Sequence, residues 1–398
     1  MEFFCFLKAE RKSKMTSIPQ HPRLVSYFQK IDFLTRNNRD FLWEKFVKLG
    51  SKNVRLLCCS KNFPPLIEKQ LSYTLKDSAP NYDATIVVWN ENEIENFLGK
   101  FIDHHIKSRI RLEQLVYKTK NIGFEVSDEN LHIKINSTGG IINNFEVFDF
   151  NYSKHNPIIR SLANSGIFTA FDQKNNIYYY AVKDLHPEEF IKQGHVFVQI
   201  FNKILKTPNS NLAHGAVVGL NQKGMLFCAR GQRGKSTLAV LSMMQGFEYV
   251  SDDYLVLEKE GDELFAHPIY SIITLSPKMY NELYEDLNGK FVSNNARRDK
   301  YVIDIRAYHE NFREKYPIKI CVFPQIVNDE KPSIIPCKKG RAITQLVHST
   351  INQMEDKHDI KTIQKLISFI KDFDFYQINL CSDINANVEC LRQFCRQI

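Results

Sequence analysis

A lysine, two hydroxyl residues and two aspartates lie close together in the second half of this 398-residue sequence. Gly234-Lys235-Ser236-Thr237 follows a short apolar run at 224–228 and precedes a helix-forming run at 238–244. A buried strand, a glycine-containing loop and a helix, in that order, form the context that a phosphate-binding loop requires. These residues therefore predict a site for a phosphorylated ligand.

The chemistry of such a loop follows from the free amides at the start of a helix. Those N–H groups have no partner within the helix and carry partial positive charge, which attracts phosphate oxygens. Glycines supply the backbone angles that aim them, a lysine binds the β- and γ-phosphates, and a serine hydroxyl holds Mg²⁺. The expected nucleotide-binding residues are Arg230, Gly231, Gln232, Arg233, Gly234, Lys235, Ser236 and Thr237. Ala229 stands where such loops usually have their first glycine, and the alternative is a chance Gly-Lys-Ser-Thr at an ordinary helix start.

Asp252 and Asp253 end the next apolar run, one helix after Ser236. A strand that ends in carboxylates beside a phosphate loop is where a second Mg²⁺ ligand belongs. We expect Asp252 to accept a proton from an attacking hydroxyl, and Asp253 to bind Mg²⁺ together with Ser236. The alternative is a solvated turn, since aspartate favours turns.

His214 and two arginines complete the set of candidate site residues. Residues 212–220 read as one strand, and a turn at 221–224 leads into the strand before the loop, which places His214 near the site. Arg297 and Arg298 lie in a basic loop that suits a nucleotide or acceptor clamp, although surface arginines are commonly only solvated. His195 is expected on a helix over 187–204, in a structural role.

A histidine-glycine pair, a hairpin, a Gly-Lys-Ser loop, a short helix and an Asp-Asp pair together resemble the HPr kinase/phosphorylase family. The sequence is more similar still to the HPr-kinase-like proteins of ribosomal-peptide biosynthesis, including lasso-peptide precursor kinases. The resemblance covers about residues 195–350 and is specific over 213–257. It implies a P-loop domain of the HPr kinase/PEP carboxykinase type that uses ATP and Mg²⁺, with Lys235, Ser236, Asp252, Asp253 and His214 in corresponding roles. It also implies a serine acceptor on a peptide or protein, and a homo-oligomer.

The pattern of the whole chain indicates an α/β protein, α+β overall, with two domains. An N-terminal α+β domain at 1–185 carries no chemical motif, and a P-loop catalytic domain follows at 186–398. Within the first, residues 20–50 have helical spacing, whereas 54–59, 83–89, 131–135, 145–150 and 178–182 read as strands.

Composition limits the class of partner. A net charge of +8 suits an anionic ligand, and no aromatic-interleaved basic pattern indicates nucleic acid. No apolar run approaches the ~20 residues of a membrane span. The nine scattered cysteines suggest a reducing cytoplasm, and the absence of a C-x-x-C pair argues against a zinc site.

Three functions fit these observations. The first is an ATP-dependent kinase that phosphorylates a serine of a peptide or protein, or a small-molecule hydroxyl. The second is a nucleotide-binding scaffold with little or no turnover in a peptide-modification assembly. A simple ATPase or GTPase is the third, with ATP preferred because no Asn-Lys-x-Asp motif for guanine is present.

Overall fold

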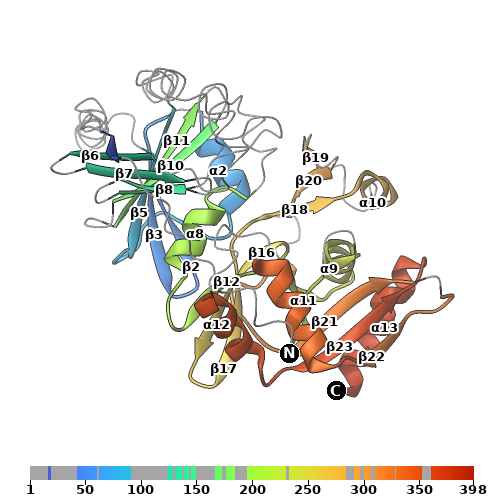
Figure 1. Cartoon of the computed structure of the whole chain (residues 1–398). Helices are drawn as coiled ribbons and strands as arrows, with labels where there is room; N and C mark the ends of the chain where they lie inside the picture. The colour runs from blue at the N-terminus through green and yellow to red at the C-terminus, as the bar shows by residue number, and fades with distance from the viewer. Residues whose placement is uncertain are drawn as a thin grey trace, which may run out of the picture. The chain divides into compact units, whose positions relative to one another are not determined.

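The structure is a computed structural model of the chain. It describes residues 17–18, 43–60, 62–90, 124–128, 131–136, 139–142, 145–148, 166–172, 176–183, 195–229, 233–283, 291–295, 300–305, 310–327, 329–351 and 360–398. The described parts are a mixture of α-helices and several β-sheets (Figure 1).

The chain divides into two compact units. The first comprises Met1–Asp40 and Trp89–Asp184, and the second comprises Phe41–Val88 and Leu185–Ile398. This division differs from a single boundary at residue 185, because Phe41–Val88 belongs with the second unit.

The first unit contains a run of strands in which each pairs with the next along the chain. Strands β6 to β11 form this antiparallel meander, and β1 pairs parallel to β6. Their bounds are β1 Ser17–Ile18, β6 Phe124–Asp128, β7 Leu131–Asn136, β8 Gly139–Ile142, β9 Phe145–Phe148, β10 Gly166–Asp172 and β11 Ile177–Lys183. The strands expected over 131–135, 145–150 and 178–182 are thus confirmed within a residue or two.

The second unit begins with a small α/β segment. Strand β2 (Trp43–Leu49) pairs antiparallel with β3 (Lys52–Cys58) and β4 (Leu75–Lys76), and β3 pairs parallel with β5 (Ala84–Asn90). Helix α2 (Pro64–Leu71) connects β3 to β4. The helix expected over 20–50 is wrong where the structure can test it, because 43–49 is a strand. A tight turn at Gly50, with φ +61°, returns the chain into β3, and the strand pairing that results outweighs the helical spacing of the apolar residues.

Specific hydrogen bonds join this segment to the later part of the second unit. The Ser51 amide donates to Glu258 Oε2 at 2.8 Å, and the Tyr73 amide donates to the Ser271 hydroxyl at 2.9 Å. These contacts span about half of the chain, so no local sequence pattern could have placed the segment here.

A nine-stranded mixed sheet forms the centre of the second unit. Its order is β12-β16-β17-β21-β14-β13-β15, and β23 pairs parallel with β21 and antiparallel with β22. The bounds are β12 Ser210–His214, β13 Ala216–Leu220, β14 Lys223–Phe227, β15 Glu248–Ser251, β16 Tyr254–Glu260, β17 Glu263–Pro268, β21 Tyr316–Ile326, β22 Ser333–Pro336 and β23 Asp374–Leu380.

Alternate residues of the central strands face two separate apolar cores. Val218, Met225 and Val322 face one core, and their neighbours Leu226 and Cys321 face the other. The helices α9 (Lys235–Met244) and α13 (Ile384–Gln397) contribute to the first core, whereas α11 (Lys339–Ile351) and α12 (Ile360–Ile370) contribute to the second. The sheet is thus the middle of three layers (Figure 1).

A small sheet and helix α10 (Pro277–Leu283) lie on the side of α9. Strand β18 (Ile272–Leu275) and β19 (Phe291–Asn295) flank β20 (Lys300–Asp304) in a small antiparallel sheet. Helix α10 begins with the Met279 amide donating to the Ser276 hydroxyl at 3.4 Å, as at a serine N-cap.

Two expectations for this unit need correction. The single strand expected over 212–220 is two strands: β12 pairs with β16, and β13 pairs with β14 and β15. The break falls at Gly215, where a Cβ would lie 2.9 Å from the carbonyl of Phe227. His195 is not helical: it has φ +49°, and α8 starts only at Val198 (Val198–Ile204).

None of the helices in the described ranges is both long enough and apolar enough to cross a membrane.

Candidate functional site

The end of β14 and the start of α9 lie on either side of the predicted phosphate loop. Cys228 and Ala229 are buried after β14, and α9 begins at Lys235. Gly234 precedes the helix with φ +88°, a left-handed angle that glycine adopts without penalty. Because the N-cap residue is a glycine, no N-cap side chain accepts a hydrogen bond from the first amides of α9. Those amides are therefore available to a ligand. The expected strand before the loop and the expected helix after it are confirmed.

A side chain at Gly234 would press on the end of the buried Leu380 side chain. A Cβ there would lie 2.6 Å from Leu380 Cδ1, whereas one at Gly246, with nearly the same φ of +87°, would meet nothing within 4 Å. We expect Gly234→Ala to lower the free energy of unfolding by more than the about 1–2 kcal/mol that left-handed backbone alone costs. Gly246→Ala is the matched control, and urea unfolding measures both. Equal losses in the two variants would contradict the packing argument.

Lys235 is buried and bound to both aspartates. Its Nζ lies 2.7 Å from Asp252 Oδ1 and 3.1 Å from Asp253 Oδ1, and its side chain is 8% exposed. Burial disfavours the charged ammonium, but the two carboxylates outweigh burial and raise the pKa of Lys235. Lys235 is thus a fixed positive charge at the start of α9, paired with the two carboxylates that follow β15.

A left-handed turn presents the Asp253 side chain to this lysine. Asp253 has φ +64°, and its carbonyl accepts a hydrogen bond from the Gly215 amide at 3.0 Å. Thr274 donates to Asp253 Oδ2 at 3.2 Å. Burial raises the carboxyl pKa, but Lys235 and two histidines more than reverse this, so the pKa of Asp253 lies well below its usual value. Asp253 is therefore ionised at neutral pH.

The two histidines approach Asp253 from different strands and loops. His214 Nε2, at the end of β12, is 3.5 Å from Asp253 Oδ1, and His195 Nε2 is 3.7 Å from Oδ2. The ring of Tyr254 contacts both imidazoles edge-on, with centroid distances of 4.8 Å to His195 and 5.4 Å to His214. The predicted proximity of His214 is confirmed. Sequence reasoning missed His195 and Thr274, which have no motif and lie 58 and 21 residues from Asp253.

His195 makes the stability of the unit sensitive to acid. Burial lowers its pKa to about 4, and the neighbouring aspartates only partly oppose this. The unfolded chain takes up a proton near pH 6.5 and the folded chain does not, so stability falls between pH 6.5 and 4, by about 3 kcal/mol at about 1.4 kcal/mol per pKa unit. His195→Asn keeps a residue that tolerates left-handed angles. We expect the free energy of unfolding of this variant, measured with urea, to depend much less on pH between 4 and 6.5 than that of the parent protein. An unchanged slope would contradict the assignment.

Asp252 is more deeply buried than Asp253. Its side chain is 0% exposed, against 14% for Asp253. Oδ1 binds Lys235, whereas Oδ2 has no hydrogen-bond partner in the described part of the chain. A buried carboxylate oxygen without a hydrogen-bond donor is costly, so Oδ2 is suited to a cation.

Three of the other predicted nucleotide-binding residues lie in the described part of the chain. Arg233 is exposed beside Gly234, and Ser236 and Thr237 are half-buried in the first turn of α9. Arg230, Gly231, Gln232, Arg297 and Arg298 lie outside the described residues.

The oxygen ligands at the site fit Mg²⁺. This ion prefers carboxylate and hydroxyl oxygens and usually keeps several waters. The unpartnered Oδ2 of Asp252, the carboxylate of Asp253 and the hydroxyl at Ser236 are donors of this kind, and no thiol is among them.

Comparison with known proteins adds little to this geometry. No family model matches the sequence, and no curated protein matches it. Among solved structures, the chain is similar to the Hpr(Ser) kinase/phosphatase from Coxiella burnetii, with 12% sequence identity over 47% of this chain and 97% of that one, and a TM-score of 0.28. A TM-score of 0.28 is too low to support a function, so the function has to be inferred from the site itself.

Proposed function

We propose that the second unit is an ATP-dependent kinase that transfers the γ-phosphate to a hydroxyl group. One observation carries the proposal: a buried lysine, placed by a left-handed glycine at the start of α9, lies between two aspartates that follow the next strand. Phosphate-binding lysine, helix amides and paired carboxylates are the parts that phosphoryl transfer needs, because its catalysis is mainly positioning and charge stabilisation.

In this proposal, Lys235 and the first amides of α9 hold the phosphates. The ammonium is permanently charged because its pKa is raised. When ATP binds, its phosphate oxygens replace part of the contact between Lys235 and the carboxylates. The α9 amides then share the negative charge that develops during transfer.

The burial of the two aspartates argues for an exchange of the roles expected from sequence. Asp252, fully buried, fixes Lys235 and offers Oδ2 to Mg²⁺ together with the hydroxyl at Ser236. Asp253, which is more exposed, accepts the proton of the acceptor hydroxyl, while His195, His214 and Thr274 fix its orientation. Bound Mg²⁺ would neutralise phosphate charge.

The acceptor we infer is a serine of a peptide or protein. This rests on the sequence resemblance over 213–257, and the same chemistry would serve a small-molecule hydroxyl. A cytoplasmic location and a homo-oligomer belong to the same proposal.

A nucleotide-binding scaffold is the second candidate. It is favoured by the engagement of Lys235 with both carboxylates at 2.7 and 3.1 Å, since a phosphate must compete with these two ion pairs. Strong pairing of this kind suits a site that binds nucleotide and turns over slowly.

A labelling experiment separates the two candidates. The full chain is incubated with Mg²⁺ and ATP labelled at the γ-phosphate, together with a panel of serine-containing peptides and their serine-to-alanine counterparts. A kinase labels the serine peptides and spares the alanine ones. Binding of ATP without label on any acceptor would favour the scaffold.

A further inference from the structure

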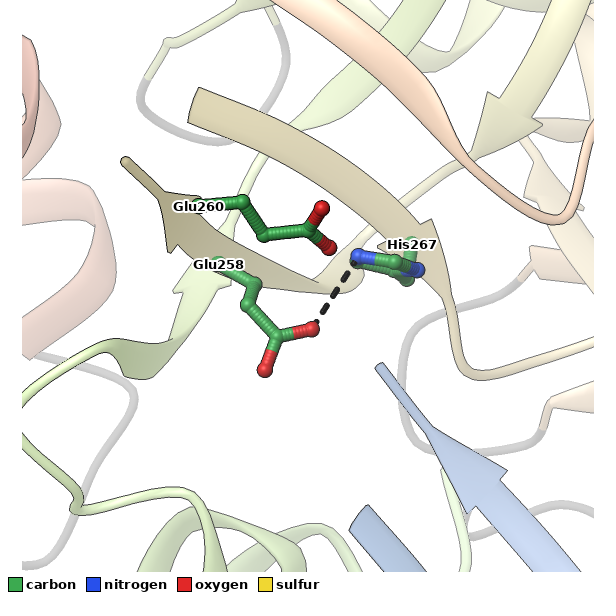
Figure 2. A group of neighbouring side chains, drawn as sticks. All are labelled: Glu258, Glu260 and His267. Carbon is green, nitrogen blue, oxygen red and sulfur yellow. Dashed lines mark ion pairs between the residues drawn. The ribbon is translucent and has the colours of Figure 1, made fainter. Parts of the chain in front are cut away.

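A second cluster of ionisable side chains lies on β16 and β17, away from the lysine and aspartates. It comprises Glu258 and Glu260 on β16 and His267 on β17, and one ligand atom from each lies within 4.8 Å of the others. Figure 2 shows the three side chains directed toward one another. Glu258 is five residues beyond Asp253, roughly 17 Å along an extended strand. The cluster is therefore separate from the candidate kinase site.

Strand geometry explains why the three side chains share a face. Glu258 and Glu260 are two residues apart, so they point to the same side of β16. His267 pairs with Val256, which lies on that side as well. Side chains of opposed residues in an antiparallel pair project from the same face, so His267 is a diagonal neighbour of Glu258.

His267 carries the argument for a bound ion. Its side chain is only 9% exposed, and Nε2 lies 3.3 Å from Glu258 Oε2. Despite this distance Nε2 has no hydrogen-bond partner in the described ranges. The ring also hydrogen-bonds to the backbone of Glu314. Because Nε2 has no hydrogen-bond partner, Nδ1–H makes that bond, and in the neutral imidazole Nε2 directs its lone pair toward a carboxylate oxygen.

As a neutral imidazole and a carboxylate, these two groups are both acceptors, and they need either a proton on Nε2 or a metal ion between them. Two ligand atoms at about 2.0–2.1 Å from a tetrahedral Zn²⁺ are about 3.3 Å apart, and this is the separation of His267 Nε2 and Glu258 Oε2. A histidine whose other nitrogen donates to a backbone carbonyl is the usual arrangement of a metal ligand.

Neighbouring groups already hold the carboxylates in place. The Ser51 amide donates to Glu258 Oε2, and the Ser51 hydroxyl donates to Oε1. Lys315 binds Oε2 of Glu260 at 2.6 Å, which leaves Oε1 of that carboxylate. Since Glu260 is exposed and on the strand end, its side chain has room to close the remaining distance.

We propose that Glu258, Glu260 and His267 form a three-ligand zinc site that fastens β16 to β17. One nitrogen and two carboxylate oxygens, with a water as fourth ligand, suit Zn²⁺. Through Ser51 and Glu314 the site also secures the β2–β3 turn and the segment before β21. The cysteine spacing that argued against zinc does not bear on this site, because its ligands are not thiols.

The test uses the full chain, stripped with a chelator and titrated with Zn²⁺ by calorimetry. We expect one equivalent to bind, and at least a tenfold loss of affinity in His267→Gln and in Glu260→Gln. Glu260 is exposed, so the second variant removes a ligand with little risk to folding. Glu389→Gln, an exposed glutamate on α13 outside the cluster, is the matched control and should bind as the parent does.

X-ray absorption at the zinc edge identifies the ligands directly. Nitrogen and oxygen neighbours near 2.0 Å support the proposal, whereas sulfur at about 2.3 Å would assign the zinc to cysteines. The proposal is overturned by that sulfur shell, by the absence of zinc binding, or by unchanged affinity in both ligand variants.

Discussion

Replacing Lys235 with methionine is expected to abolish phosphoryl transfer and to destabilise the second unit. Methionine keeps the length of the side chain and removes the charge. The variant lacks the ammonium that binds the phosphates, so we expect transfer to fall by at least about 100- to 1,000-fold. It also leaves two buried carboxylates without their cation, and removing one partner of a buried pair costs about 3–5 kcal/mol. Urea unfolding and labelled-ATP transfer measure the two effects.

A second variant separates lost chemistry from lost folding. The double variant Lys235→Met/Asp252→Asn removes one of the two buried carboxylates left without a cation. It should therefore regain part of the free energy of unfolding but no phosphoryl-transfer activity. Lys223→Met is the control for a lysine at the edge of β14, where Nζ donates to the Cys395 carbonyl. Full transfer in a folded Lys235→Met protein would contradict the kinase proposal.

The Asp253→Asn variant is expected to lose transfer by about 100- to 10,000-fold, the range that a general base contributes. Asparagine tolerates left-handed backbone, so the turn at φ +64° is preserved and the loss reports the carboxylate. Binding of ATP should persist, because Lys235 keeps Asp252 as a partner.

Asp252→Asn provides the comparison that assigns the two carboxylates. We expect this change mainly to raise the Mg²⁺ concentration needed for half-maximal transfer, since Oδ2 of Asp252 is the unpartnered oxygen. At saturating Mg²⁺, transfer should be lower in Asp253→Asn than in Asp252→Asn. The opposite order would restore Asp252 as the base.

The chemical centre of the site was largely predictable from sequence because its parts are consecutive. Gly234 and Lys235 lie at the start of α9, and Asp253 lies between β15 and β16, where local patterns also predicted the ends of elements. Asn221 and Gln222 were expected in a turn, and both have positive φ in the two-residue connection between β13 and β14.

The remainder depends on long-range pairing that no local pattern contains. His195 reaches Asp253 only because His195 and Phe197 both take left-handed angles before α8. The strand at 43–49 depends on partners in β3 and β4, and Ser51 depends on Glu258, 207 residues away. Such contacts override local propensity, which is only a weak preference.

Binding of Mg²⁺·ATP to the full chain tests the central claim most directly. Calorimetric titration should show one site per chain, with affinity that falls at least tenfold in folded Lys235→Met and falls again when Mg²⁺ is withheld. Saturable binding with this dependence is the predicted result. If ATP at millimolar concentration produced no binding, or if Lys235→Met bound it equally well, the site around Lys235 would not be a nucleotide site.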